Sequence, residues 1–232
     1  MVKTLCLIPA RQGSVGLKNK NIKLLNGIPL IKHAYTIAKR VKHIDDIVIS
    51  SDSKKYLNKI ENKNVIKILR PKRLSSSKSL ILDVVKHTLL KIKKKYKYLI
   101  LLEPTSPLTD PKEVNLAFKK LLSSNSEIDF VVSVISLPKY NSKFILKLNK
   151  KNKIKFKKFP KNSNRQSFTE EFFISGNFYI AKIDKLLQNK SWISNKTFGF
   201  KIKRSIHTDI DTNLDLLFTQ SIIKNGLFKK IK

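Results

Sequence analysis

Residues 4–21, TLCLIPARQGSVGLKNKN, join a short apolar run to a loop rich in glycine and cations. The run Thr4–Ile8 has the length of a strand that is covered on both faces. In the loop, Gly13 and Gly16 permit positive φ angles and close backbone approach. One hydroxyl and three cations accompany them: Ser14, Arg11, Lys18 and Lys20. This combination predicts a cradle for a polyphosphate. A solvated turn is the alternative, because the spacing matches neither the dinucleotide fingerprint nor the P-loop.

Strand-length apolar runs alternate with helix-length segments as far as residue 135. The runs expected to be strands are Ile47–Ser50, Val65–Leu69, Tyr98–Leu102 and Phe130–Ile135. Apolar residues at three- and four-residue spacing predict helices over Ile28–Val41, Ser53–Glu61, Leu80–Lys95 and Pro111–Ser123. The alternation predicts an α/β fold with a doubly wound, mostly parallel sheet, whose ligand site lies at the carboxyl ends of the strands.

The alternation stops after Pro138. Two segments flank an Asn/Lys turn, and we expect them to form a small β-hairpin that protrudes from the main sheet. They are Lys143–Leu148 and Lys153–Phe159. The last elements expected are strands over Gly176–Ala181 and Phe198–Lys203 and a helix over Leu214–Asn225 that stops at Gly226. Since neither a linker nor a repeat is visible, residues 1–232 are predicted to form one domain, with 138–165 as an arm.

The composition limits the class of protein. The 232 residues include 49 Lys and Arg against 16 Asp and Glu, a net charge of +33, and 41% of them are apolar. That apolar share excludes a disordered polyelectrolyte and supports one buried core. Only six of the cations are Arg, the residue best suited to binding phosphates and bases. We therefore interpret the lysine excess as solvated surface and expect no specific nucleic-acid partner.

Cysteine content and hydropathy bear on the compartment. Cys6 is the only cysteine, so no intramolecular disulfide can form, and its apolar neighbours predict a small core residue. The N-terminal apolar run is shorter than that of a signal peptide. No stretch reaches the length of a membrane span, about 20 apolar residues. We expect a cytoplasmic protein without membrane contact.

Two aspartates stand out in a chain with few acids. Asp209 and Asp211 alternate in an extended segment and so face the same side. Two hard oxygen ligands there can share Mg²⁺ with phosphate oxygens and water. The alternative interpretation is capping of the final helix by Asp211 or Thr212.

Motifs in the same order along about the whole chain resemble those of the acylneuraminate cytidylyltransferases, also called CMP-sialic acid synthetases. Residues 9–21 resemble their ARxGSKGxxxKN motif. The other matching segments are SSD (50–52), LRPKRL (69–74), LLEPTSPL (101–108), NRQ (164–166), SGNFYI (175–180) and DIDTNLDL (209–216). The related 3-deoxy-manno-octulosonate enzymes have an Arg-Leu-Pro-Gly-Lys-Pro ending where this chain has Lys20 and Asn21.

The resemblance implies a nucleotide-diphospho-sugar transferase-like fold and a reaction. The anomeric hydroxyl of a nonulosonic acid, of the sialic, legionaminic or pseudaminic type, attacks the α-phosphate of CTP and gives a CMP-sugar and pyrophosphate. By motif position, the catalytic residues are Arg11, Lys20 and Asp211. The residues implied for the nucleotide are Arg11, Gly13, Ser14, Lys20, Asn21, Arg70 and Ser79. Asp209 and Asp211 are implied as ligands of Mg²⁺.

The resemblance also implies a sugar site and a homodimer. Arg165 and Gln166 match the family's Arg-Gln, and Lys143 lies near a family lysine, although a solvated lysine remains the alternative. The arm at 138–165 would carry Lys143 toward the partner's sugar site, or else fold back on its own domain. The pair Phe172–Phe173 is expected to pack in the core or the dimer, with ligand stacking as the alternative.

Several positions depart from the family pattern. Val15 replaces the first lysine of GSKG and removes one cation from the cradle. Glu103 stands where many relatives have Gln, and Ser175 where they have Asn; both are expected toward the sugar pocket. An apolar pair at 80–81 replaces small hydroxyl residues, which leaves Ser79 as the contact expected for the base.

Two alternative functions remain open on the sequence. The first is an enzyme of the same fold that uses another sugar acid or another nucleotide. The second is a basic nucleic-acid-binding protein that has kept the fold and lost the activity. The presence of Arg11, Lys20, Asp209 and Asp211 argues against the second, because an electrostatic binder would not need them.

Overall fold

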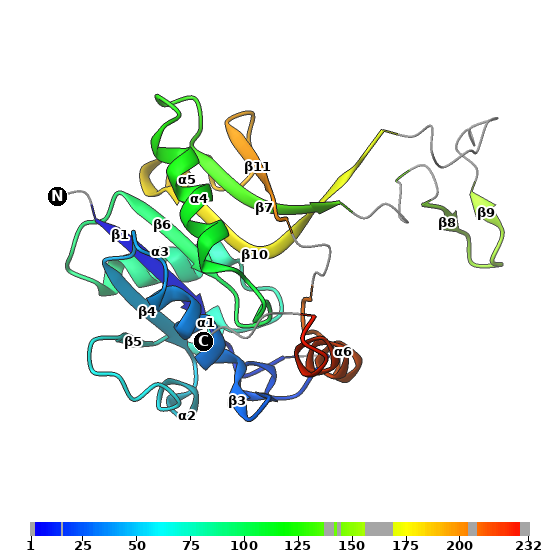
Figure 1. Cartoon of the computed structure of the whole chain (residues 1–232), viewed down its shortest axis with the longest axis horizontal. Coiled ribbons are helices and arrows are strands. Elements are labelled where there is room, and N and C mark those ends of the chain that lie inside the picture. Colours follow the sequence, from blue (N-terminus) through cyan, green and yellow to red (C-terminus); the bar gives the residue numbers. More distant parts are fainter. Residues whose placement is uncertain are drawn as a thin grey trace.

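Seven strands pair into one central sheet in the computed structural model of the chain, which describes residues 3–14, 16–136, 142, 145–155, 169–203 and 208–227. The strands are β1 (Thr4–Pro9), β4 (Asp46–Ser51), β5 (Ile66–Leu69), β6 (Tyr98–Leu102), β7 (Phe130–Ser136), β10 (Phe172–Lys182) and β11 (Thr197–Lys201). Their order across the sheet is β11-β7-β10-β6-β1-β4-β5 (Figure 1). Parallel pairing joins β1 to β4 and β6, β4 to β5, and β7 to β11. β10 runs antiparallel to β6 and β7, so the predicted mostly parallel sheet is confirmed.

Helices cover both faces of this sheet. They are α1 (Leu30–Lys39), α2 (Lys54–Leu57), α3 (Ile81–Lys91), α4 (Pro111–Leu122), α5 (Ile183–Asn189) and α6 (Asn213–Lys224), with short 3₁₀ helices η1 (Lys20–Ile22) and η2 (Lys72–Leu74). Alternate residues of β1 belong to two different apolar clusters. Cys6 and Ile8 pack in the cluster that contains α1, α2 and α4, whereas Leu5 and Leu7 pack in the cluster of α3 and α5. The sheet is therefore doubly wound, and Cys6 is a core residue as predicted, with a thiol pKa raised by burial.

Three local features differ from the sequence prediction. β10 begins at Phe172 rather than Gly176, because its first three residues extend the pairing with β7. Residues 28–29 form a strand and not the start of a helix: β2 (Leu24–Leu25) and β3 (Ile28–Pro29) make a small hairpin. Its turn residues Asn26 and Gly27 both have positive φ, 49° and 76°, which suits a tight hairpin turn. The segment 53–61 holds only the one-turn helix α2.

The last helix ends as predicted. The C-cap of α6 is Asn225, and Gly226 follows it with φ of 68°, a left-handed conformation that favours glycine. Among the described residues, none of the helices has both the length and the hydropathy needed to cross a bilayer.

The predicted hairpin is present within its described part. β8 (Lys147–Leu148) pairs antiparallel with β9 (Ile154–Lys155), and Figure 1 shows the two strands apart from the central sheet. The Asn149 side chain accepts hydrogen bonds from the backbone N–H groups of Lys151 and Lys153, both at 2.9 Å, and so shapes the turn. The other parts of the predicted arm, 138–141, 143–144 and 156–165, lie outside the described residues.

Candidate active site

A pocket of about 240 Å³ opens where β1, β5 and β6 end. These parallel strands present their carboxyl ends at one edge of the sheet, the place where α/β folds bind ligands. The pocket is lined by seven residues that were predicted for the site: Arg11, Ser14, Lys20, Asn21, Arg70, Ser79 and Glu103. Lys143, Arg165 and Gln166, which were predicted for the sugar, and Val15 lie outside the described residues.

Neighbouring elements hold the first loop in place. The backbone N–H of Gln12 donates to Asp52 Oδ1 at 2.9 Å, and the Asn21 side chain donates to the carbonyl of Arg11 at 2.9 Å. Asn21 is only 4% exposed. Its amide nitrogen therefore supports the backbone that carries Arg11, a role that the motif alone did not indicate.

The glycines of this loop do not use the positive φ angles that they permit. Neither Gly13 nor Gly16 has a positive φ. The left-handed position is taken by Asn19, with φ of 57°, whose side chain accepts a hydrogen bond from the Tyr56 hydroxyl at 3.1 Å. Asparagine tolerates this conformation because its short polar side chain bonds locally. Gly13 is surrounded by open space, which leaves its backbone accessible to a ligand.

Arg70 is a buried cation at the back of the pocket. Arg70 directly follows β5 and is 5% exposed. Its Nε donates a hydrogen bond to Ser75 Oγ at 2.8 Å. Burial lowers the guanidinium pKa to about 10, with the nearby charge of Arg11 acting in the same direction and Asp52 opposing it. Nη1 has no hydrogen-bond partner among the described residues. An unpaired buried donor is costly, so this nitrogen is suited to an anionic or carbonyl oxygen of a ligand.

The serine-rich turn after η2 is organised by its own hydrogen bonds. Ser79 Oγ donates to the carbonyl of Arg73 at 2.9 Å and accepts from the backbone N–H of Ser76 at 3.0 Å. Arg11 Nη1 donates to the carbonyl of Ser76 at 2.8 Å, which ties the first loop to this turn. The Ser79 hydroxyl thus stabilises the turn, and its predicted contact with the base stays a prediction.

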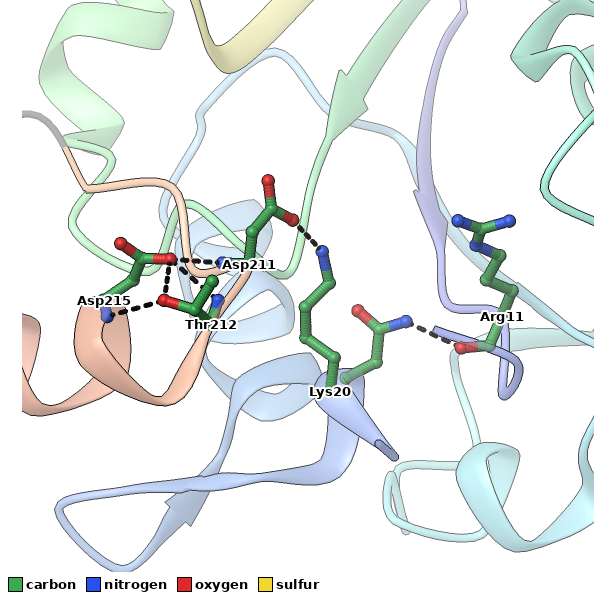
Figure 2. Close-up of polar contacts among 6 residues, drawn as sticks. Arg11, Lys20, Asp211, Thr212 and Asp215 are labelled. Atoms are coloured by element: carbon green, nitrogen blue, oxygen red, sulfur yellow. Dashed lines mark hydrogen bonds and ion pairs between the residues drawn. The ribbon is translucent and has the colours of Figure 1, made fainter. Parts of the chain in front are cut away.

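Lys20 and Asp211 form an ion pair beside the pocket. Lys20 Nζ lies 2.5 Å from Asp211 Oδ1, and Figure 2 shows Lys20 reaching from the first loop to the segment before α6. The helix is capped by other groups: Thr212 Oγ1 accepts from the backbone N–H of Asp215, and Asp215 Oδ2 accepts from that of Thr212. Capping by Thr212 is therefore confirmed, and it leaves the Asp211 carboxylate to Lys20.

The two predicted metal ligands share one side of their segment. Asp209 and Asp211 are exposed, whereas Ile210 between them is fully buried, as alternation in an extended segment requires. Exposed carboxylates are hard oxygen donors and fit a divalent cation whose other ligands are phosphate and water. The described part of the chain contains no group of three or more side chains that could hold a metal by themselves.

The Glu103 carboxyl group has a raised pKa. Its pKa is raised to about 7, first by burial and then by the negative charges of Asp209 and Asp211, with Lys20 opposing. Three acidic groups therefore influence one another at this end of the pocket. Glu103, which was predicted for the sugar, lines the same pocket as the residues predicted for the nucleotide.

Ser175, which was expected toward the sugar pocket, does not line this pocket. It is 2% exposed inside β10, and its hydroxyl donates to Ser133 Oγ at 2.8 Å. Residues that sequence reasoning did not assign to the site include Asp52, Ser76 and Thr105. Asp52 directly follows β4, and this position at the carboxyl end of a parallel strand could have indicated it as a site residue.

Comparison with known proteins fits this geometry. A family model described as cytidylyltransferase matches residues 5–197. The chain belongs to the cytidylyltransferase family. An N-acylneuraminate cytidylyltransferase of Streptococcus agalactiae serotype V is 28% identical to this chain. The match covers 93% of this chain and 52% of the streptococcal protein, so the chain spans about half the length of that relative. A CMP-N,N'-diacetyllegionaminic acid synthase of Legionella pneumophila is 26% identical, covering 96% of this chain and 97% of the relative.

A solved structure supports the fold of this chain. A CMP:2-keto-3-deoxy-manno-octonic acid synthetase in complex with CTP aligns with a TM-score of 0.70 over 97% of this chain and 99% of that chain, at 15% identity. At this identity the likeness establishes the shared fold. It agrees with the nucleotide-diphospho-sugar transferase-like architecture that the sequence predicted.

Proposed function

We propose that this chain transfers CMP from CTP to a nonulosonic acid of the sialic, legionaminic or pseudaminic type and releases pyrophosphate. The observation that carries the proposal is one pocket that gathers the cations Arg11, Lys20 and Arg70 next to the aspartates at 209 and 211. A triphosphate needs cations, and transfer of its phosphoryl groups needs stabilisation of the charge on its oxygens. Two relatives support the choice of sugar, since their names specify an N-acylneuraminate and a CMP-N,N'-diacetyllegionaminic acid.

Individual residues have distinct roles in this proposal. Arg11 and Lys20 hold phosphate oxygens from the first loop, and Ser14 adds a buried hydroxyl that has no partner among the described residues. Arg70 offers its unpaired Nη1 to the nucleotide. Asn21 keeps the carbonyl of Arg11 in place and thereby the loop that binds the phosphates. Positioning of this kind supplies much of the rate in phosphoryl transfer.

We propose Mg²⁺ as the cofactor. Asp209 and Asp211 would hold it, and when bound it neutralises negative charge on the phosphate oxygens. Lys20 holds the carboxylate of Asp211 and so fixes one of the two ligands. Removal of divalent cations with EDTA should abolish turnover, and added Mg²⁺ should restore it.

The sugar site and the homodimer belong to the same proposal. Glu103 lies in the pocket, and the arm would bring Lys143 of a second subunit to it, with Arg165 and Gln166 gripping the sugar carboxylate. Exposed apolar side chains in and near the arm support the proposal that a second subunit covers them. They are Ile145, Leu146, Leu148 and Ile154 in the hairpin region and Phe172, Phe173 and Ile174 at the start of β10, with exposures of 39–64%. An isolated hairpin is marginal in water, so these side chains need a covering surface.

The decisive experiment is pyrophosphate release from CTP with a panel of nonulosonic acids, with GTP, UTP and ATP as nucleotide controls. Turnover with CTP and at least one of these acids supports the proposal and names the sugar. Turnover only with another nucleotide or another sugar acid supports the alternative enzyme of the same fold. A cytoplasmic setting is proposed with this function.

A nucleic-acid-binding protein is the second candidate, favoured only by the net charge of +33. Release of condensed counterions rewards any cationic surface, so weak binding that falls steeply with salt is expected and carries no function. Sequence-selective binding at physiological salt, together with no nucleotidyl transfer to any sugar acid, would favour this candidate instead.

A further inference from the structure

The first loop and the segment before α6 meet at a point that has no room for a side chain. A Cβ atom at Gly16 would lie 2.7 Å from the carbonyl oxygen of Asp211, closer than carbon atoms of this kind lie in proteins. The φ angle of Gly16 is not left-handed, so an alanine there meets no conformational obstacle. Glycine is therefore required at this position for space.

Two further contacts join the same two segments. Leu17, the next residue, is 4% exposed and belongs to the apolar cluster that contains the fully buried Ile210. Lys20 forms the ion pair with the Asp211 carboxylate. Ile210 is also held from another side, because its backbone N–H donates to the carbonyl of Thr105 at 2.9 Å. The backbone and the carboxylate of Asp211 are thus fixed by neighbours of Gly16 in the first loop.

We propose that Gly16 is a positioning residue that sets the place of Asp211 relative to Lys20, an inference that rests on the proposed function. The group that a Cβ would strike is backbone and belongs to Asp211 itself. It cannot move aside as a flexible side chain would, so the collision displaces either Asp211 or the loop that carries Lys20. In both cases the ion pair and the carboxylate offered to the metal lose their alignment.

The test is the substitution Gly16→Ala, with Gly199→Ala as the matched control. At Gly199, in β11, a Cβ would meet Val134 side-chain carbons at 3.5 Å, an ordinary contact. Gly16→Ala should lower kcat by about 10²-fold, since small displacements of catalytic groups have effects of this size. It should also raise the Mg²⁺ concentration needed for half-maximal rate and leave KM for CTP little changed. Gly199→Ala should match the wild type in all three.

A variant that lacks both members of the ion pair separates positioning of the pair from a general effect. If Gly16 acts through the pair, adding Gly16→Ala to Lys20→Ala/Asp211→Asn should slow the enzyme no further than Lys20→Ala/Asp211→Asn alone. A full multiplicative loss in the triple variant would overturn the proposal. So would a Gly16→Ala enzyme with wild-type kcat and Mg²⁺ requirement.

Labelling of Lys20 gives a readout that does not depend on turnover. In the wild type Lys20 is paired and 17% exposed, so acetic anhydride should modify it slowly, as measured by mass spectrometry of its peptide. Gly16→Ala and Asp211→Asn should each accelerate this modification, and Gly199→Ala should not. If the wild type released no pyrophosphate with any substrate, the proposed function would fail. The labelling rates would still decide the role of Gly16, and unchanged labelling in Gly16→Ala would refute it.

Discussion

Lys20 Nζ lies 2.5 Å from Asp211 Oδ1, although 191 residues separate the two in the sequence. Lys20→Ala should therefore lower kcat by about 10²–10³-fold, because it removes a cation that holds the reacting phosphates in the proposed function. The Asp211 side chain is 64% exposed, so the free energy of unfolding should change by less than about 1 kcal/mol. Steady-state pyrophosphate release and urea unfolding measure the two effects.

Lys94→Ala is the matched control for Lys20→Ala. It also breaks a Lys–Asp ion pair, with Asp46 at 3.1 Å, but outside the pocket. Its kcat should equal that of the wild type. Near-normal turnover of Lys20→Ala at saturating CTP would show that the first loop does not hold the phosphates as proposed.

Thr212→Ala should destabilise the protein by about 1 kcal/mol, the usual contribution of an N-cap side chain. The hydroxyl accepts from the backbone N–H of Asp215 at 3.2 Å and cannot be replaced by a methyl group. Thr212→Ser keeps the acceptor and should restore the free energy of unfolding, which chemical denaturation measures. Equal stability of the Ala and Ser variants would mean that Asp215 alone supports the start of α6.

Glu103 should make stability depend on pH. Its pKa in the folded protein is raised to about 7 from 4.5, so the folded state binds a proton more tightly than the unfolded state does. The contribution of the Glu103 carboxyl group to the free energy of unfolding is therefore fully present below about pH 4.5 and is lost as pH rises through about 7. Glu103→Gln removes this loss and should be more stable than the wild type at pH 8, by about 1–3 kcal/mol.

Urea unfolding at pH 5 and at pH 8, with EDTA present, measures this difference between Glu103→Gln and the wild type. The gap between the two proteins should shrink toward the acidic end. A gap of the same size at both pH values would mean that the Glu103 carboxyl titrates as an ordinary exposed acid.

Substitution in the hairpin tests the proposed dimer. Leu148 and Ile154 are cross-strand neighbours that are 57% and 50% exposed, so an Asp at either position leaves the fold of one chain intact. Leu148→Asp should shift the particle from dimer to monomer in light scattering and reduce activity. Leu90→Asp, at a position 85% exposed on α3, should change neither. A wild-type enzyme that is strictly monomeric and fully active would disprove the arm.

The alternation of strand-length apolar runs with helix-length segments was enough to predict the parallel part of the sheet. Strands such as β6 are buried on both faces, so they appear in the sequence as unbroken apolar runs. It could not predict the β2–β3 hairpin, whose strands have two residues each. The contact between Lys20 and Asp211 could not be predicted from residue spacing, because the two are far apart in the sequence. The family motifs indicated each of them as a site residue. The sequence indicates Gly16 only through the backbone freedom of glycine. The structure shows that glycine is needed there because a Cβ atom would collide with the carbonyl oxygen of Asp211.

Translation produces the two sides of the ion pair at very different times. The first loop is made directly after β1, whereas Asp211 joins the nascent chain only after every strand of the central sheet has been synthesised. At about 5–20 residues per second, many seconds separate the two events. A ribosome-bound chain can therefore hold a nearly finished sheet with an incomplete site. In the proposed function, activity requires the segment before α6 to dock on the first loop, so we expect it only after synthesis has passed the last strand.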